Sequence, residues 1–160
     1  MAVDIFLKLD PIKGESIDKT HKDQIDVLSW SWGMSQSGTF HSGSGGGAGK
    51  VSVQDLHFTH WVDKATTYLF QACAKGTHIA KGLLTVRKAG GSALEYVKIS
   101  MEEILVSSVS TGGSHGDDRL VENVSLNFRK FKVEYTPQTD KGAAGTASEF
   151  KWDIPANDEA

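Results

Sequence analysis

The chain contains 160 residues, of which 39% are apolar and 23% are charged, and its formal net charge is −3. A chain of this length fits one domain with a core of its own, and the composition disfavours wholesale disorder. No apolar run approaches the roughly 20 residues that span a bilayer, and no concentrated basic face is available for a phosphate backbone. Membrane insertion and nucleic-acid binding are therefore both disfavoured.

The N-terminal segment alternates apolar and polar residues, which predicts a first strand that ends at Pro11 and Gly14. One face of this strand is expected to carry Val3, Ile5, Leu7 and Leu9. No basic segment precedes a continuous apolar one, so the pattern disfavours a signal peptide and indicates a chain made in the cytosol. If the chain is exported, a machine that ignores signal peptides must export it.

A second strand is predicted from near Ile25, with two indoles on one of its faces. Its apolar face is expected to consist of Leu28, Trp30 and Trp32, a heavy hydrophobic anchor. The opposite face carries Ser29, Ser31 and Gly33. Such small residues suggest a close neighbour or a solvated channel, although polar alternation is also the default of any half-buried strand.

Residues 35–50 form a glycine-rich loop that invites comparison with a phosphate-binding loop. That motif needs Gly-x-x-x-x-Gly-Lys-Ser/Thr between a strand and a helix. Gly49 and Lys50 fit, but Ser44 stands in place of the first glycine, Val51 replaces the hydroxyl residue and a strand is expected next. Nucleotide binding is therefore disfavoured. A long loop inside a compact domain is usually functional or disordered, which suggests that this one reaches a partner.

The middle of the chain predicts a strand followed by the one convincing helix. The strand carries Val51, Val53, Leu56 and Phe58, with a phase slip near Gln54 of the kind that marks a bulge. The helix is expected over residues 63–75, with Asp63 as its cap and Gly76 in the left-handed position after its end. Its apolar stripe comprises Ala65, Leu69, Ala72 and Cys73.

The rest of the chain predicts strands and turns. Residues 82–88 and 94–101 are expected to form a hairpin around the turn at 89–92, and residues 103–109 continue its second strand. A glycine- and serine-rich loop then covers residues 110–118.

The last long strand shows a change of phase in its apolar residues. Val124, Leu126 and Phe128 share one phase, and Phe131, Val133 and Tyr135 share the other. This change predicts a bulge at Arg129 and Lys130. A polar linker over residues 137–148 and a short edge strand at 149–154 complete a mainly β chain of seven or eight strands with one helix, which indicates a barrel or a sandwich.

The histidines and the single cysteine provide no local pattern for a metal. His57 and His60 lie three residues apart in a predicted strand, so their side chains are expected on opposite faces. His41 and His115 lie in glycine-rich loops, and Cys73 lies on the apolar stripe of the helix. We therefore expect no metal site and, with one cysteine, no intramolecular disulfide.

Catalytic motifs are also missing from the sequence. No Gly-x-Ser-x-Gly elbow frames a serine, and the nearest match, Gly43-Ser44-Gly45, lacks the strand-to-helix context. Glu102 and Glu103 are neighbours whose side chains diverge in a strand. We therefore expect no enzymatic activity and no cofactor. The alternative, an enzyme or toxin, predicts that a cluster of active-site residues emerges in the fold, and nothing in the sequence requires one.

Several stretches match one known family in order along the chain. They are Gly14–Ser16, Ile25–Ser35, the glycine-rich arm running into Val53–Leu56, Leu84–Gly91, Val106–Gly113 and Glu122–Phe128. Together they resemble the haemolysin-coregulated protein (Hcp) family. No single stretch is diagnostic, but the ordered set covers most of residues 2–154 and is highly specific.

The resemblance implies a β-barrel of two sheets with a flanking helix, and a single tube domain over residues 1–160 with no C-terminal effector extension. It implies hexameric rings that stack into the inner tube of the type VI secretion system of Gram-negative bacteria. The implied partners are further copies of the chain, a VgrG-type spike, sheath and baseplate components, and small effector proteins in the lumen. The implied location is the cytoplasm before firing and the extracellular space afterwards. The alternative is a secreted, ring-shaped effector carrier that forms no long tubes.

The resemblance also suggests roles for three sets of residues. The loop that reaches a neighbouring subunit or ring is expected to comprise Gly38, Gly43, Gly45, Gly46, Gly47, Gly49 and Lys50. Ser29 and Ser31 are the candidates for the wall of the lumen and for cargo contacts. Gly90, Gly91, Lys151 and Trp152 are expected at barrel ends or edges, where exposed strands template contacts between rings or subunits.

Overall fold

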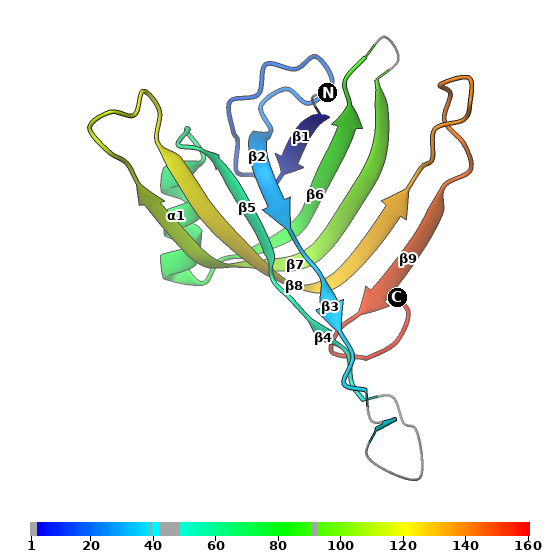
Figure 1. The fold of residues 1–160 in the computed structure, drawn as a ribbon. Coiled ribbons are helices and arrows are strands. Elements are labelled where there is room, and N and C mark those ends of the chain that lie inside the picture. Colours follow the sequence, from blue (N-terminus) through cyan, green and yellow to red (C-terminus); the bar gives the residue numbers. More distant parts are fainter. Residues whose placement is uncertain (1–2, 39, 42–48, 91–92) are drawn as a thin grey trace.

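The computed structural model describes residues 3–38, 40–41, 49–90 and 93–160. Over these residues the chain forms nine strands and one α-helix (Figure 1). In chain order these elements are β1 (Val3–Lys8), β2 (Ile25–Ser31), β3 (Met34–Ser35), β4 (Ser52–Val53), β5 (Leu56–Trp61), α1 (Thr66–Lys75), β6 (His78–Lys88), β7 (Leu94–Gly112), β8 (Val121–Tyr135) and β9 (Ser148–Asp153).

One antiparallel sheet closes into a barrel. Its strand order is β5-β2-β1-β6-β7-β8-β9, and β5 also pairs with β8, so six strands form the closed barrel and β9 lies outside it on β8. β3 and β4 form a second, two-stranded sheet that projects away from the barrel (Figure 1). This arrangement confirms the prediction of a mainly β barrel with an edge strand at the C-terminal end.

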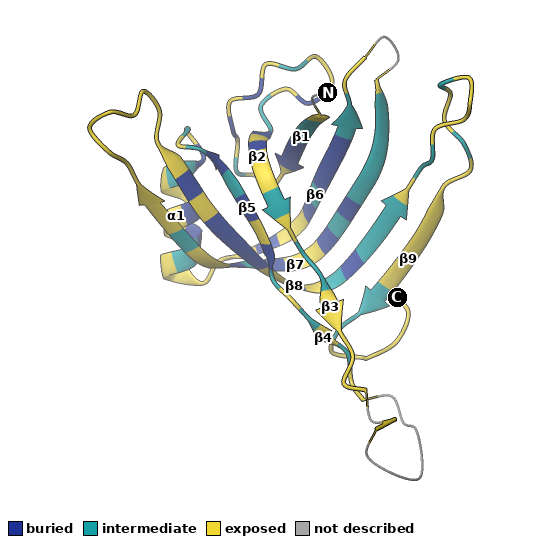
Figure 2. Ribbon diagram, in the orientation of Figure 1, coloured by how far each residue is buried: buried dark blue, intermediate teal, exposed yellow. Residues whose placement is uncertain are grey.

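Buried residues alternate with more exposed ones along parts of the strands (Figure 2), and the buried apolar side chains form one core cluster. The side chains with no exposed surface include Leu7, Leu9, Ile25, Leu56, Leu69, Leu84, Ile104 and Leu126. The predicted inner face of β1 is confirmed for Leu7 and Leu9, but Val3, at the start of the strand, is 44% exposed. Among the described residues, no helix has the length and apolar character to cross a membrane.

Two details of β2 and β5 depend on strand pairing. Leu28 is exposed, contrary to the prediction that it faces the core with the indoles, because the β2–β5 register shifts between Val27 and Ser29. Val27 packs inward in its place, and Trp30 and Trp32 pack against the core as predicted. The phase slip predicted near Gln54 is confirmed, since that residue lies in the break between β4 and β5.

The helix is shorter at its start than predicted. Asp63 does not cap it: its Oδ1 accepts a hydrogen bond from Ala65 N at 2.8 Å, within a turn that precedes the helix. The N-cap residue is Ala65, which provides no side-chain cap. The end of the helix is as predicted, because Gly76 adopts the left-handed conformation (φ 63°) and donates its N–H to Ala72 O.

The structure has no bulge at Arg129 and Lys130, where the apolar pattern predicts one. The apolar phase of β8 does change there, but β7 changes phase at the same level, at Glu103, whose φ is 53°. A bulge adds a residue to one strand only. Because both strands change together, their register is kept, and the β7–β8 register instead shifts between Val106 and Ser108.

Candidate functional site

Small polar side chains line the outer surface of β2, β5, β8 and β7. Two rows of directly paired residues cross these four strands: Ser29–Thr59–Asn123–Ser110 and Ser31–His57–Ser125–Ser108. Directly paired residues present their side chains on the same side of a sheet. These eight residues therefore form one side of the sheet, which we call the polar face; seven of them are exposed or half-buried, and Ser125 is buried among them.

Hydrogen bonds between neighbouring strands hold the polar face in shape. Ser29 and Thr59 share a bond of 2.6 Å between their hydroxyl oxygens, and Ser107 and Ser125 share one of 2.7 Å. At the rim, the Asp55 carboxylate accepts bonds from Ser107 Oγ at 2.7 Å and from Asn127 Nδ2 at 2.9 Å. The face is therefore preorganised before any partner arrives, which lowers the entropy cost of binding.

The polar face contains a shallow hollow of about 260 Å³. Its lining includes Ser29, Ser31, His57, Thr59, Ser108 and Asn123. Of the eight face residues only His57 is titratable, so the surface offers hydrogen-bond donors and acceptors with little charge. No hydrogen bond joins a hydroxyl of this face to a histidine among the described residues.

The sequence identified part of this face. Ser29 and Ser31 are exposed and lie side by side in space on it, as their spacing predicts. Sequence reasoning missed the other six residues, because they come from strands whose pairing is set by the fold. His57 and His60 do point to opposite faces, since His57 is exposed and His60 is buried.

The glycine-rich arm leaves the barrel through β3 and β4 (Figure 1). Gly38, Gly49 and Lys50 are exposed or at the edge of that ribbon, and a Cβ on Gly49 would overlap the Ser37 side chain. Gly43, Gly45, Gly46 and Gly47 lie outside the described residues. The described part of the arm thus starts from a projecting ribbon and not from the barrel wall.

The residues expected at ring faces lie in two separate places where the structure describes them. Gly90 has a φ of 146° in the turn between β6 and β7, and Gly91 lies outside the described residues. In β9, Lys151 is exposed while Trp152 is half-buried and packs against the core. Because Lys151 and Trp152 are adjacent in a strand, they point to opposite faces.

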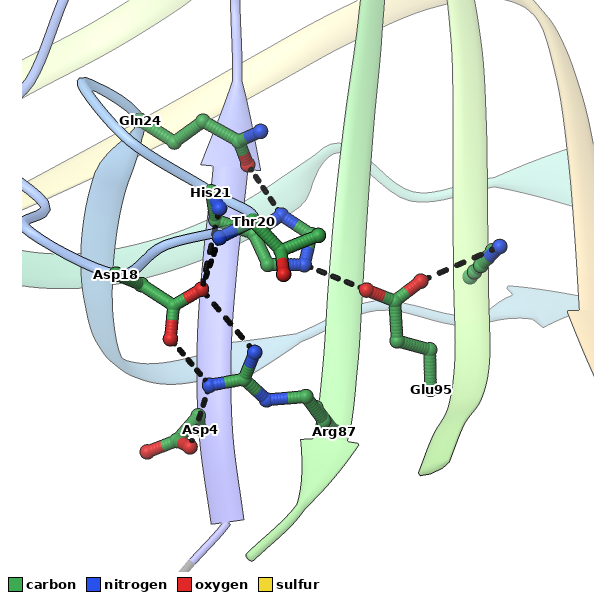
Figure 3. Close-up of polar contacts among 8 residues, drawn as sticks. Asp4, Asp18, Thr20, His21, Gln24, Arg87 and Glu95 are labelled. Carbon is green, nitrogen blue, oxygen red and sulfur yellow. Dashed lines mark hydrogen bonds and ion pairs between the residues drawn. The ribbon is translucent and has the colours of Figure 1, made fainter. Parts of the chain in front are cut away.

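A loop over residues 9–24, between β1 and β2, is clamped onto the barrel by polar contacts that sequence reasoning missed (Figure 3). His21 stacks on Phe6 at 4.3 Å between ring centroids, and its Nε2 lies 2.6 Å from Glu95 Oε1. Arg87 Nη2 donates to Asp18 Oδ2 at 2.6 Å and to Asp4 Oδ2 at 3.0 Å. The bond from Arg87 holds the pKa of Asp18 far below its usual range.

A second polar cluster is buried inside the barrel near the start of α1. His60 and Glu122 have no exposed side-chain surface, and His60 Nε2 lies 2.6 Å from Glu122 Oε2. Asp63 Oδ2 lies 3.6 Å from His60 Nδ1. Burial opposes protonation of His60, but the bonds and charges of Asp63 and Glu122 outweigh it and raise the pKa of His60.

This raised pKa predicts that stability depends on pH. The His60 contribution is fully present below its ordinary pKa of 6.5 and is lost as pH rises through the raised folded value. Urea unfolding at steps from about pH 6 to about pH 9 should show the free energy of unfolding falling faster in the wild type than in His60→Gln. Parallel pH profiles for the two proteins would contradict the assignment.

Neither cluster forms a metal centre. No group of three or more histidine, cysteine, aspartate or glutamate side chains with metal-binding geometry occurs within the described ranges. Cys73 is partly buried on α1, as the apolar stripe predicts.

Comparisons with known proteins agree on one family. The family model described as "Type VI secretion system effector, Hcp" matches residues 6–135. The chain is 57% identical over 162 residues to Protein hcp1 of Pseudomonas aeruginosa, covering all of both chains. A solved type six secretion system protein has a TM-score of 0.94 at 30% identity, covering 99% of this chain and 100% of its own. Hcp1 from Salmonella typhimurium has a TM-score of 0.80 at 39% identity, covering 100% of both chains.

Proposed function

This chain belongs to the Hcp family of type VI secretion proteins, and from that premise we propose that it forms hexameric rings that stack into the inner tube of the secretion system. The family is one of structural, secreted tube proteins and not of enzymes. In the proposed assembly, residues 1–160 act as a single tube domain. The proposed partners are further copies of the chain, the spike, sheath and baseplate, and small effector proteins inside the tube.

The observation that carries the proposal is the polar face. A tube wall must allow varied proteins to pass without strong adhesion or repulsion. Two ordered rows of serine, threonine, asparagine and one histidine supply weak hydrogen-bonding groups and little charge. We assign this face to the lumen, where it would contact effectors. An ordinary solvated sheet face is the alternative assignment, since polar alternation is common in half-buried sheets.

The projecting β3–β4 ribbon supports the stacking step. The ribbon projects away from the barrel, so an arm that extends from it would reach a neighbouring ring without disturbing the core. Glycines permit close backbone approach to such a neighbour. The chain would then be cytoplasmic before the machine fires and extracellular after it.

The test is the mass of the purified protein in solution, by size-exclusion chromatography with light scattering and negative-stain microscopy. Six chains of 17.3 kDa predict a species of about 104 kDa with a central hole. Tubes at high protein concentration would separate the tube subunit from a soluble ring-shaped carrier, which should stop at single rings. A monomer at every concentration would overturn both.

A substitution on the polar face tests the lumen assignment separately. Ser31→Gln places a longer side chain over the hollow of about 260 Å³ and should leave rings intact. Loss of one well-fitted contact should weaken cargo retention about tenfold, equivalent to about 1.4 kcal/mol. Retention is measured as the amount of small effector protein that co-purifies with the rings, with the exposed β9 variant Ser148→Gln as the control. Equal retention by both variants would favour an ordinary solvated face.

A further inference from the structure

A hollow lined by lysines lies on the outer surface of the sheet, away from the polar face. It has a volume of about 800 Å³, and its lining sets Lys8, Lys81, Lys130, Lys132 and Lys151 against Asp10, Glu102 and Ala160, the last residue of the sequence. We call it the lysine hollow. A chain with a net charge of −3 thus concentrates nearly a third of its 17 basic lysine and arginine residues at one concave surface.

Strand register explains why these lysines converge. One row of directly paired residues runs Lys8–Leu83–Ser100–Lys132–Lys151, and the next runs Lys81–Glu102–Lys130–Asp153. The strands bend at this level, because β7 has its left-handed residue at Glu103. Gly82 belongs to the same bend: a Cβ there would come within 3 Å of both Ile104 and Leu9. All residues of the two rows except Asp153 line the hollow.

Three lysines of the hollow are paired within the chain, and two, at opposite ends of its rows, are not. Lys8, Lys130 and Lys132 have carboxylates at 3.4 Å, 3.7 Å and 3.5 Å. By contrast, no carboxylate of the described residues lies within 4.0 Å of the ammonium of Lys81 or Lys151, both of which are exposed. A concave surface with unpaired cations favours an anionic partner.

The same chain carries an acidic projection of suitable size. Residues 110–121, at the free end of the β7–β8 hairpin, are exposed at every position and extend beyond the barrel (Figure 2). Its turn is closed by a bond from Asp117 N to Ser114 O at 3.1 Å and by one from Ser114 N to Asp117 Oδ2 at 3.0 Å. Arg119 folds back over the Trp61 ring at 4.6 Å, which leaves Asp117 and Asp118 as the charged side chains of the tip. We call this segment the acidic arm.

The acidic arm cannot reach the hollow of its own chain. It projects from one end of β7 and β8, whereas the hollow lies along the middle of these strands and extends to β6 and β9 (Figure 1). Two complementary patches at different places on one molecule generate a head-to-tail contact between copies, and such contacts close into rings or continue as stacks.

We propose that the lysine hollow of one copy receives the acidic arm of the next copy, with Asp117 and Asp118 facing Lys81 and Lys151. This inference rests on the proposed assembly and adds the pair of surfaces that meet in it. The narrow hairpin tip, unlike a flat acidic surface, fits a hollow of about 800 Å³. Electrostatic complementarity would also fix the direction in which neighbours join.

A charge swap tests the contact in the full-length protein. The hollow variant Lys81→Glu/Lys151→Glu and the arm variant Asp117→Lys/Asp118→Lys each bring like charges together. Each should raise the protein concentration at half assembly by on the order of a hundredfold. Combining all four substitutions restores opposite charges and should return the midpoint to within about tenfold of the wild type. Assembly is followed by light scattering and microscopy.

The matched control is Lys19→Glu/Lys22→Glu, which changes the net charge equally at exposed lysines of the loop over residues 9–24. Circular dichroism and urea unfolding establish that each variant is folded. The inference is overturned if the hollow variant assembles like this control, or if the four-fold variant fails to recover although it is folded. In either case wild-type rings would still support the proposed function, whereas a wild type that never assembles would overturn both.

Discussion

Replacing Glu122 by leucine is expected to lower the free energy of unfolding by about 3–5 kcal/mol, because it removes one partner of a fully buried ion pair. Leucine nearly preserves the volume, so the loss reports mainly the charge of His60 left without its carboxylate 2.6 Å away. Thr66 Oγ1, which donates to the same carboxylate at 3.2 Å, also loses its acceptor. Urea unfolding followed by tryptophan fluorescence measures the change.

The matched control for this experiment is Glu103→Leu in the neighbouring strand. Glu103 pairs with Arg129 at 3.3 Å, but its side chain is 57% exposed. Exposed ion pairs contribute little, so the loss of this pair should lower the free energy of unfolding by less than about 1 kcal/mol. The substitution also changes the side chain at a residue with a left-handed backbone (φ 53°), and that effect adds to the measured value. A Glu122→Leu loss no larger than the control would show that His60 is neutral and needs no carboxylate.

Deleting residues 39–48 is expected to abolish stacking and leave single rings intact. The arm joins β3 to β4, and these two strands lie outside the barrel, so a short glycine link between them leaves the barrel core unaltered. Because closure of a shorter loop changes the entropy only slightly, the free energy of unfolding should change by less than about 1 kcal/mol. Negative-stain microscopy at high concentration should show rings of unchanged diameter and no tubes.

A second shortened loop controls for loop length itself. Residues 139–143 lie in an exposed turn between β8 and β9, and replacing them with two glycines should leave tubes as in the wild type. An arm-deleted protein that still forms tubes would remove the arm from the stacking contact. The acidic arm and the lysine hollow would then be the remaining surfaces with a stated role in assembly.

Local patterns in the sequence were sufficient for most elements of the fold. Strand alternation placed Leu7 and Leu9 in the core, and glycine after a helical stripe placed the end of α1 at Gly76. Both are local effects: side-chain direction repeats every two residues in a strand, and the left-handed conformation favours glycine. The ordered family stretches lie elsewhere in the chain and led to the family that the comparisons identify.

Features that depend on pairing between distant strands could not be predicted. Leu28 turns outward because the β2–β5 register shifts beside it, and the phase change of β8 needs no bulge because Glu103 in β7 compensates for it. His21 and Glu95, which are 74 residues apart, meet only when the loop over residues 9–24 folds across β1. A single sequence carries no signal for such long-range contacts, since they depend on which strands pair and in which register.

The sequence by itself determined a mainly β chain, its helix end, its exposed serines on β2 and its family. Only the tertiary structure decided that four strands combine their small polar residues into the polar face, and that five lysines from β1, β6, β8 and β9 converge on one hollow. The physical reason is that side-chain direction is set locally by the backbone, whereas the neighbours a side chain meets are set by how the barrel closes.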